Sequence, residues 1–88
     1  MSDVTLYNWI TVDNEEWGVH LWGTLETYED GTQQVVDIDA RYLLPNGTEQ
    51  NTSTKNLTVP EEVVMLAQAL LDDPNTSDAM LEHGAIHR

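Results

Sequence analysis

The first two-thirds of the chain alternates apolar and polar residues with a period of two. This period is that of a β-strand with one buried face, because successive side chains on a strand point to opposite faces. The alternation predicts strands over residues 3–13, 17–29 and 32–44, followed by a weaker polar strand over residues 49–59. The apolar rows are Val4, Leu6, Ile10 and Val12, then Trp17, Val19, Leu21, Gly23 and Leu25, and finally Val36, Ile38, Ala40, Tyr42 and Leu44.

Turns are predicted between these rows. The Asp-Gly pair at 30–31 and the Asn-Gly pair at 46–47 favour two-residue hairpin turns, because both positions tolerate positive φ. The segment 13–16 is interpreted as a longer loop that sets Val12 opposite Trp17. With these registers the three aliphatic rows share one face of the sheet, and a slip of one residue would destroy that agreement.

The fourth predicted strand forms an edge of the sheet. The same registers set Lys55 opposite Ile38, so that its side chain faces inward. An inward lysine on an edge strand discourages edge-to-edge aggregation. A bulge at Lys55 is the alternative.

The sequence after the sheet predicts a helix over residues 60–72. Thr58 and Glu61 have the spacing of a capping box, and Pro60 suits the first turn of a helix. A short second helix over residues 77–83 is compatible with the pattern. A chain of 88 residues has room for one domain. We therefore expect an α+β domain spanning 1–88, a four-stranded antiparallel meander with one main C-terminal helix packed on one face.

The opposite face of the predicted sheet carries residues that are common in protein interfaces. The registers place Tyr7 beside Trp22, and Trp9 beside His20 and Arg41. We interpret this face as a docking surface for a protein. Two alternatives stay open: Arg41 stacks on Trp9 or Trp22, pairs with Asp39 and simply covers the sheet, or a second copy of the chain covers it as a homodimer. The predicted contact residues on this face are Tyr7, Trp9, His20, Trp22, Glu26, Asp37, Asp39 and Arg41.

Other classes of function are disfavoured by composition. A single outward Arg among carboxylates would repel a polyanion, so direct binding of nucleic acid is not expected. An open sheet face with no nucleophile beside His20 does not suggest an enzyme. The chain has no cysteine, and neither a metal nor a cofactor is expected. No stretch resembles a signal peptide or a membrane span, so a cytoplasmic location without membrane contact is expected.

The chain carries 16 acidic residues against 3 lysines and arginines, which gives a formal net charge of −13. Self-repulsion at such a charge opposes the compact state unless a partner or salt offsets it. One explanation is a basic partner, steered to the acidic surface. Salt adaptation and the solubility of a structural or accessory subunit are the alternatives. The acids occur in runs: Asp13, Glu15 and Glu16; Glu26, Glu29 and Asp30; Asp37 and Asp39; Glu61 and Glu62; Asp72 and Asp73.

In size, charge and predicted fold alone, a chain with these acidic runs resembles small phage-encoded inhibitors that block CRISPR or restriction complexes. The resemblance implies a non-enzymatic inhibitor that occupies the basic surface of a nucleic-acid-binding protein or complex, with its carboxylates imitating phosphates. It also implies action in the cytoplasm of the host cell. The resemblance assigns a role to no residue, so the contact residues rest on the strand pattern and the acidic runs, which add Asp13, Glu15, Glu16, Glu29 and Asp30.

Overall fold

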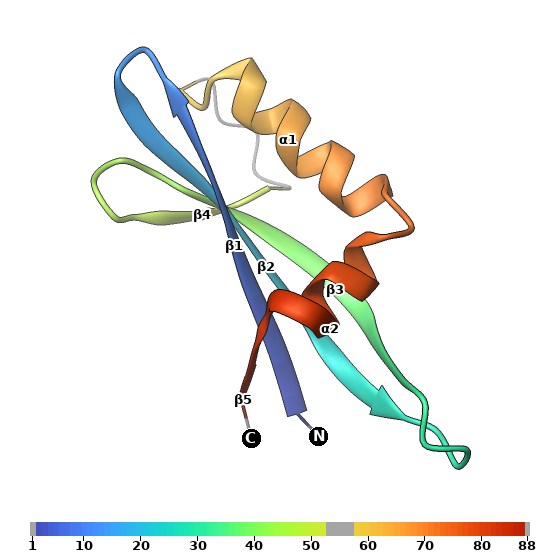
Figure 1. The fold of residues 1–88 in the computed structure, drawn as a ribbon. Helices are drawn as coiled ribbons and strands as arrows, with labels where there is room; N and C mark the ends of the chain where they lie inside the picture. The colour runs from blue at the N-terminus through green and yellow to red at the C-terminus, as the bar shows by residue number, and fades with distance from the viewer. Residues whose placement is uncertain (1, 53–57, 88) are drawn as a thin grey trace.

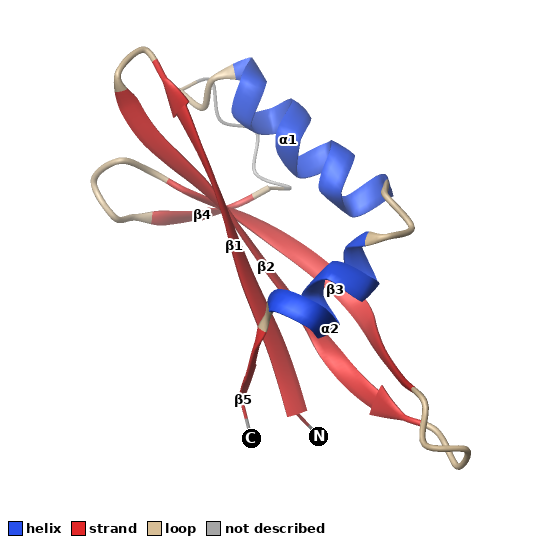
Figure 2. Ribbon diagram, viewed as in Figure 1, coloured by secondary structure: helices blue, strands red, loops and turns tan. Residues whose placement is uncertain are grey.

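The computed structural model describes residues 2–52 and 58–87, which form one antiparallel sheet and two helices (Figures 1 and 2). The sheet order is β4-β3-β2-β1-β5, and both helices pack on one face. The α+β class and the antiparallel sheet are confirmed, although the sheet has five strands rather than four. The elements are β1 (Ser2–Val12), β2 (Glu15–Thr27), β3 (Gln33–Leu43), β4 (Glu49–Asn51), α1 (Glu61–Asp72), α2 (Thr76–His83) and β5 (Ala85–His87).

The two edge strands differ from the prediction. β4 is assigned over three residues only, and Lys55 lies outside the described residues. At the other edge, β5 pairs with the start of β1, so that Ala85 lies opposite Thr5 and His87 opposite Asp3. The alternating pattern gives no signal for a strand this short. β5 places the C-terminal residues beside the N-terminal ones (Figure 1).

The turn between β1 and β2 is tighter than predicted. Asp13 and Asn14 have φ values of 50° and 64°, as in a two-residue type I′ turn. Val12 therefore lies opposite Glu15, and the predicted pairing of Val12 with Trp17 is wrong. The error is two residues, which is one full strand period, so every β1 side chain keeps its predicted face.

The other two hairpins have three-residue loops instead of the predicted two-residue turns. The Tyr28 N–H donates to the Thr32 carbonyl at 2.8 Å, and Gly31 between them has a φ of 87°. The second hairpin repeats this arrangement around Gly47, whose φ is also 87°. A left-handed glycine at the third loop position is the usual alternative to a two-residue turn. Each loop changes the pairing beside it by one residue.

A bulge in β3 restores the predicted pairing between β2 and β3. Two residues, Asp37 and Ile38, face the stretch around Gly23, where the register shifts by one. Asp37 takes a left-handed φ of 54°. On the C-terminal side of the bulge, from Asp39 to Leu43, β3 makes the predicted pairs with β2. On its N-terminal side Val35 is buried in place of Val36, so the prediction of Val36 as a core residue is wrong. The bulge therefore corrects the parity error that the three-residue loop introduces.

The core lies between the sheet and the helices. α1 packs on β2 and β3, and α2 packs on β3 and β1. α1 begins at Glu61 with Pro60 as its N-cap, so the predicted capping box is wrong. Neither described helix is long or apolar enough to cross a membrane. The buried apolar residues are Val4, Trp17, Val19, Leu21, Val35, Ala40, Tyr42, Val59, Val63, Ala67 and Met80.

The left-handed backbone at Asp37 leads to a testable prediction. Asp37→Gly and Asp37→Ala remove the same charge, but only glycine adopts this φ without a steric cost. We expect Asp37→Gly to be more stable than Asp37→Ala by about 1 kcal/mol. Urea unfolding of the two variants measures the difference. Equal midpoints and slopes would show that the bulge is not formed as described.

Candidate partner-binding face

The face of the sheet opposite the two helices, here called the outer face, carries predicted contact residues from three neighbouring strands. Tyr7 of β1 lies opposite His20 of β2, which lies opposite Arg41 of β3. Trp22 lies opposite Asp39. The predicted neighbours of Tyr7 and Trp9 are wrong, because the β1–β2 turn shifts β1 by two residues. The shift brings Tyr7 rather than Trp9 onto His20.

The side chains of these residues form a continuous contact series, here called the aromatic row: Trp9, Tyr7, His20, Trp22 and Arg41. The Tyr7 ring stacks on His20 with centroids 4.3 Å apart and on Trp9 with centroids 5.9 Å apart. His20 and Trp22 meet at 5.8 Å in a tilted arrangement. The Arg41 guanidinium lies 5.0 Å from the centre of the Trp22 ring, within the range of a cation–π contact. Each ring therefore holds its neighbour in place.

Gly18 allows the Trp9 indole to lie flat on the sheet. A Cβ atom at Gly18 would come within 3.0 Å of two atoms of the Trp9 ring. Trp9 nevertheless keeps 54% of its surface exposed, and Tyr7 keeps 46%. The row thus presents two aromatic rings to solvent in fixed orientations.

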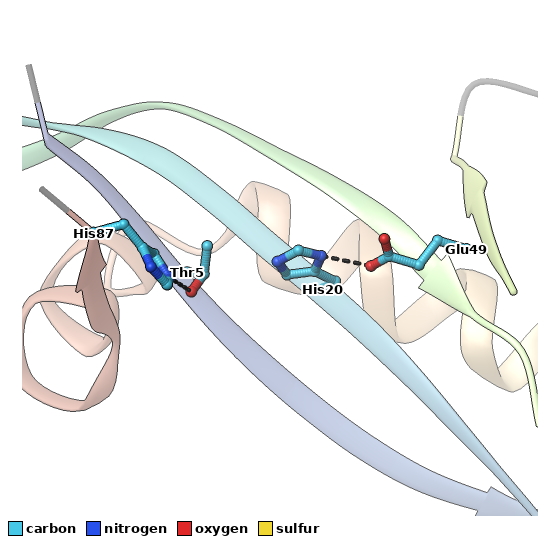
Figure 3. A network of polar contacts seen from close by, with 4 residues as sticks. All are labelled: Thr5, His20, Glu49 and His87. Atoms are coloured by element: carbon cyan, nitrogen blue, oxygen red, sulfur yellow. Dashed lines mark hydrogen bonds and ion pairs between the residues drawn. The ribbon is translucent and has the colours of Figure 1, made fainter. Parts of the chain in front are cut away.

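A carboxylate from β4 holds His20. The His20 Nδ1–H donates to Glu49 Oε1 at 2.6 Å (Figure 3). This bond assigns the ring orientation and leaves Nε2, which is buried and has no hydrogen-bond partner within the described part of the chain. Glu49 was not among the predicted contact residues. The three-residue loop around Gly47 shifts β4 by one residue relative to the prediction. Predicting a three-residue loop at the Asn-Gly pair would have placed Glu49 on the outer face.

A concavity of about 500 Å³ opens beside Tyr7, between β1, β5 and the end of α2. The three histidines of the chain, His20, His83 and His87, lie on its wall, and His87 Nε2 is hydrogen-bonded to Thr5 Oγ1 at 2.8 Å (Figure 3). Across residues 2–52 and 58–87, no three His, Cys, Asp or Glu side chains are placed to share a metal ion. The wall is mainly an apolar and imidazole surface, suited to receiving a side chain.

The predicted acidic contacts flank the row and occupy both ends of the molecule. Glu26, Asp37 and Asp39 are exposed on the central strands. Asp39 accepts a hydrogen bond from the Ala40 N–H at 2.8 Å, and no ion pair joins it to Arg41 in the described structure. The longest dimension of the molecule is 46 Å, and each end is a hairpin (Figure 1). The remaining acids lie at these hairpins, with Asp13, Glu15 and Glu16 at one end and Glu29 and Asp30 at the other.

The hairpin between β2 and β3 has its own polar network. The Tyr28 hydroxyl donates to Glu26 Oε2 at 3.1 Å, and this bond raises the pKa of Tyr28. The Thr32 hydroxyl and N–H both donate to Asp30 Oδ1, and these bonds lower the pKa of Asp30. Asp30 therefore stays ionised to a lower pH than in the unfolded chain, and its stabilising effect is lost as pH falls through this lowered pKa. Asp30 thus contributes its negative charge to this end of the molecule over a wider pH range than an aspartate without these hydrogen bonds.

Comparisons of the chain with protein-family models, with curated proteins and with solved structures found no match.

The bond between His20 and Glu49 can be tested with a double-mutant cycle. Glu49→Gln removes the charge of the acceptor, and His20→Phe keeps a stacking ring while removing the donor. Because both side chains are mostly covered, we expect a coupling free energy of about 1 kcal/mol between the two changes. Chemical unfolding of the wild type, both single variants and the double variant measures it. Additive single effects would contradict the bond.

Proposed function

We propose that this protein is a small acidic inhibitor that docks on the basic surface of a nucleic-acid-binding protein or complex. The aromatic row carries the proposal, because it presents exposed rings on the sheet face that the helices leave open. The role is one of binding rather than catalysis. The encounter takes place in the cytoplasm, which is that of the host cell if the protein is encoded by a phage.

Stacking makes the aromatic row suited to docking. Trp, Tyr and Arg are the residue types most often found at the energetic centre of an interface. The stacked rings of Trp9 and Tyr7 have already lost much of their rotational freedom, so a partner that covers them orders little more. The row offers an apolar anchor that is preorganised.

The charge of the chain selects the kind of partner. A net charge of −13 raises the encounter rate with a cationic surface and opposes binding to DNA or RNA. Surfaces that bind nucleic acid carry the Lys and Arg groups that these carboxylates can pair with. The acidic ends of the molecule would then occupy positions that phosphates otherwise take, and the inhibitor would compete with nucleic acid.

Affinity capture with matched variants tests the proposed docking face. Trp9→Ala removes an exposed ring of the row, whereas Met65→Ala removes a side chain of similar exposure, 60%, from α1. We expect the wild type and Met65→Ala to capture the same nucleic-acid-binding protein, and Trp9→Ala to bind it with a loss of about 2 kcal/mol. Titration of the purified partner measures the loss.

The same captured complex tests the nature of the partner surface. Added duplex DNA or RNA is expected to displace the partner, and rising salt is expected to weaken the complex steeply. Two results would contradict the proposal: equal binding by Trp9→Ala and Met65→Ala, or recovery of the chain bound only to itself. Unfolding of each variant, measured alongside, separates lost binding from lost structure.

A further inference from the structure

β1 is longer than β5, the strand that borders it on the side away from β2. β5 pairs with β1 only over Asp3–Thr5, although β1 continues to Val12 (Figure 1). No other described strand lies on this side of β1. A stretch from Tyr7 to Thr11 is therefore an open edge of the sheet, here called the β1 edge, and it begins at the concavity beside Tyr7.

The hairpin geometry shows which main-chain groups face the β1 edge. In a two-residue hairpin the closing pair, here Val12 and Glu15, points its N–H and C=O groups toward each other. These groups alternate sides along a strand, so those of Tyr7, Trp9 and Thr11 point away from β2. The Thr5 carbonyl follows this rule and points to the β5 side, since its oxygen lies 3.0 Å from where a Cβ atom added to Gly84 would be.

The opposite edge of the sheet, along β3, is protected by several contacts. The Val35 N–H donates to Ser77 Oγ at 3.1 Å, and the Ser77 hydroxyl donates to the Val35 carbonyl at 2.9 Å. The Thr52 hydroxyl donates to the Ala40 carbonyl, and the bulge at Asp37 distorts the strand between them. Such devices keep edges from pairing with other chains. The β1 edge has neither a bulge nor a proline, and its pairing with β2 is regular throughout.

We propose that the β1 edge is a docking site for an extended, basic segment of the partner, which adds to the sheet as a strand antiparallel to β1. The segment continues the line of β5 and covers the main-chain groups of Tyr7, Trp9 and Thr11. This inference rests on the proposed function and adds to it the mode by which the partner binds. Strand addition supplies affinity through the main chain and specificity through alternate side chains.

The two faces of the β1 edge define the chemistry of that segment. Residues on its outer side come beside Trp9 and Tyr7, whose exposed rings attract cations as Trp22 attracts Arg41. Residues on its inner side come beside Leu6, Ile10 and Val12, which are apolar and only partly buried. Asn8 lies between them, and its buried Nδ2 has no hydrogen-bond partner within the described part of the chain. A segment that alternates Lys or Arg with aliphatic residues matches both faces.

Charge favours such a partner over a second copy of the chain. Two copies paired along this edge would bring together two molecules of formal charge −13. The acids at the β1–β2 turn, Asp13, Glu15 and Glu16, lie at the far end of the same edge. A cationic segment relieves this repulsion, whereas a second copy increases it.

A synthetic peptide with alternating Lys and Val residues, seven residues long and capped at both ends, is the probe for the β1 edge. In an antiparallel pair the Lys residues that face outward also direct their N–H groups to β1. N-methylation of the Lys amides should therefore weaken binding roughly ten-fold or more, since it removes these hydrogen bonds and adds bulk at the edge. N-methylation of the Val amides, which leaves the same charge, should not. Equal binding of the two methylated peptides, or no binding of the parent peptide, would overturn the proposal.

A variant of the protein provides the second test. Thr11→Pro removes the N–H that faces the edge and spares the pairing of β1 with β2, while Thr11→Val is its matched control. We expect Thr11→Pro to lose the parent peptide and the captured partner, and Thr11→Val to keep both.

Amide exchange should also show new protection of Tyr7, Trp9 and Thr11 in the wild-type complex. Binding by folded Thr11→Pro at wild-type strength would overturn strand addition alone, because the proposed function is tested separately, by the Trp9→Ala variant and by the identity of the captured partner. A dimer of the free chain that Thr11→Pro abolishes would assign the edge to a second copy instead.

Discussion

The antiparallel pairing of β2 with both of its neighbours is the interaction on which the rest of the structure depends. It gives β1, β2 and β3 a common parity, so that Val4, Leu21 and Ala40 meet the helices on one face. The same parity necessarily gathers the aromatic row on the other face. A slip of one residue on either side of β2 would mix the two sets. Core and candidate docking face are therefore two results of one register.

The alternation of apolar residues was sufficient to predict the three long strands and the face on which each aromatic residue lies. It was insufficient to predict the turns. Asp-Gly and Asn-Gly pairs suit a two-residue turn, yet both also suit a three-residue loop with a left-handed glycine, which Gly31 and Gly47 adopt. Asp13 and Asn14 adopt the two-residue turn, although neither is a glycine. The turn residues of this chain are therefore compatible with more than one loop length. The bulge at Asp37 compensates the one-residue shift that the loop around Gly31 introduces.

The neighbours within the candidate site depended on those turns. Tyr7 stacks on His20 because the turn between β1 and β2 is tight. Glu49 reaches His20 because the loop between β3 and β4 is one residue longer than predicted. Strand pattern gives the face of a residue, whereas only the exact loop gives the residue beside it. β5 was missed for a different reason, since three residues are too few to show a period.

The acidity of the chain becomes more informative when the acids are placed in the fold. The acids predicted as contacts lie at both hairpin ends and beside the row, whereas Glu61, Glu62, Asp72 and Asp73 lie at the two ends of α1. Only 3 lysines and arginines are present to offset the 16 acids. Arg41, the cation of the outer face that contacts an indole, is held by Trp22. The exposed rings of Trp9 and Tyr7 thus lie in a negative surround, an arrangement that suits a cationic protein surface better than a neutral one.

The three tryptophans allow the most direct measurement of the central claim that the outer face docks the partner. Trp9 and Trp22 belong to the aromatic row, whereas Trp17 is buried beneath the helices. Indole N–H resonances followed by NMR during titration with the captured partner report on each face of the sheet separately. Large shifts of the Trp9 and Trp22 signals with an unchanged Trp17 signal are the predicted result. Unchanged Trp9 and Trp22 signals in a saturated complex would contradict the account.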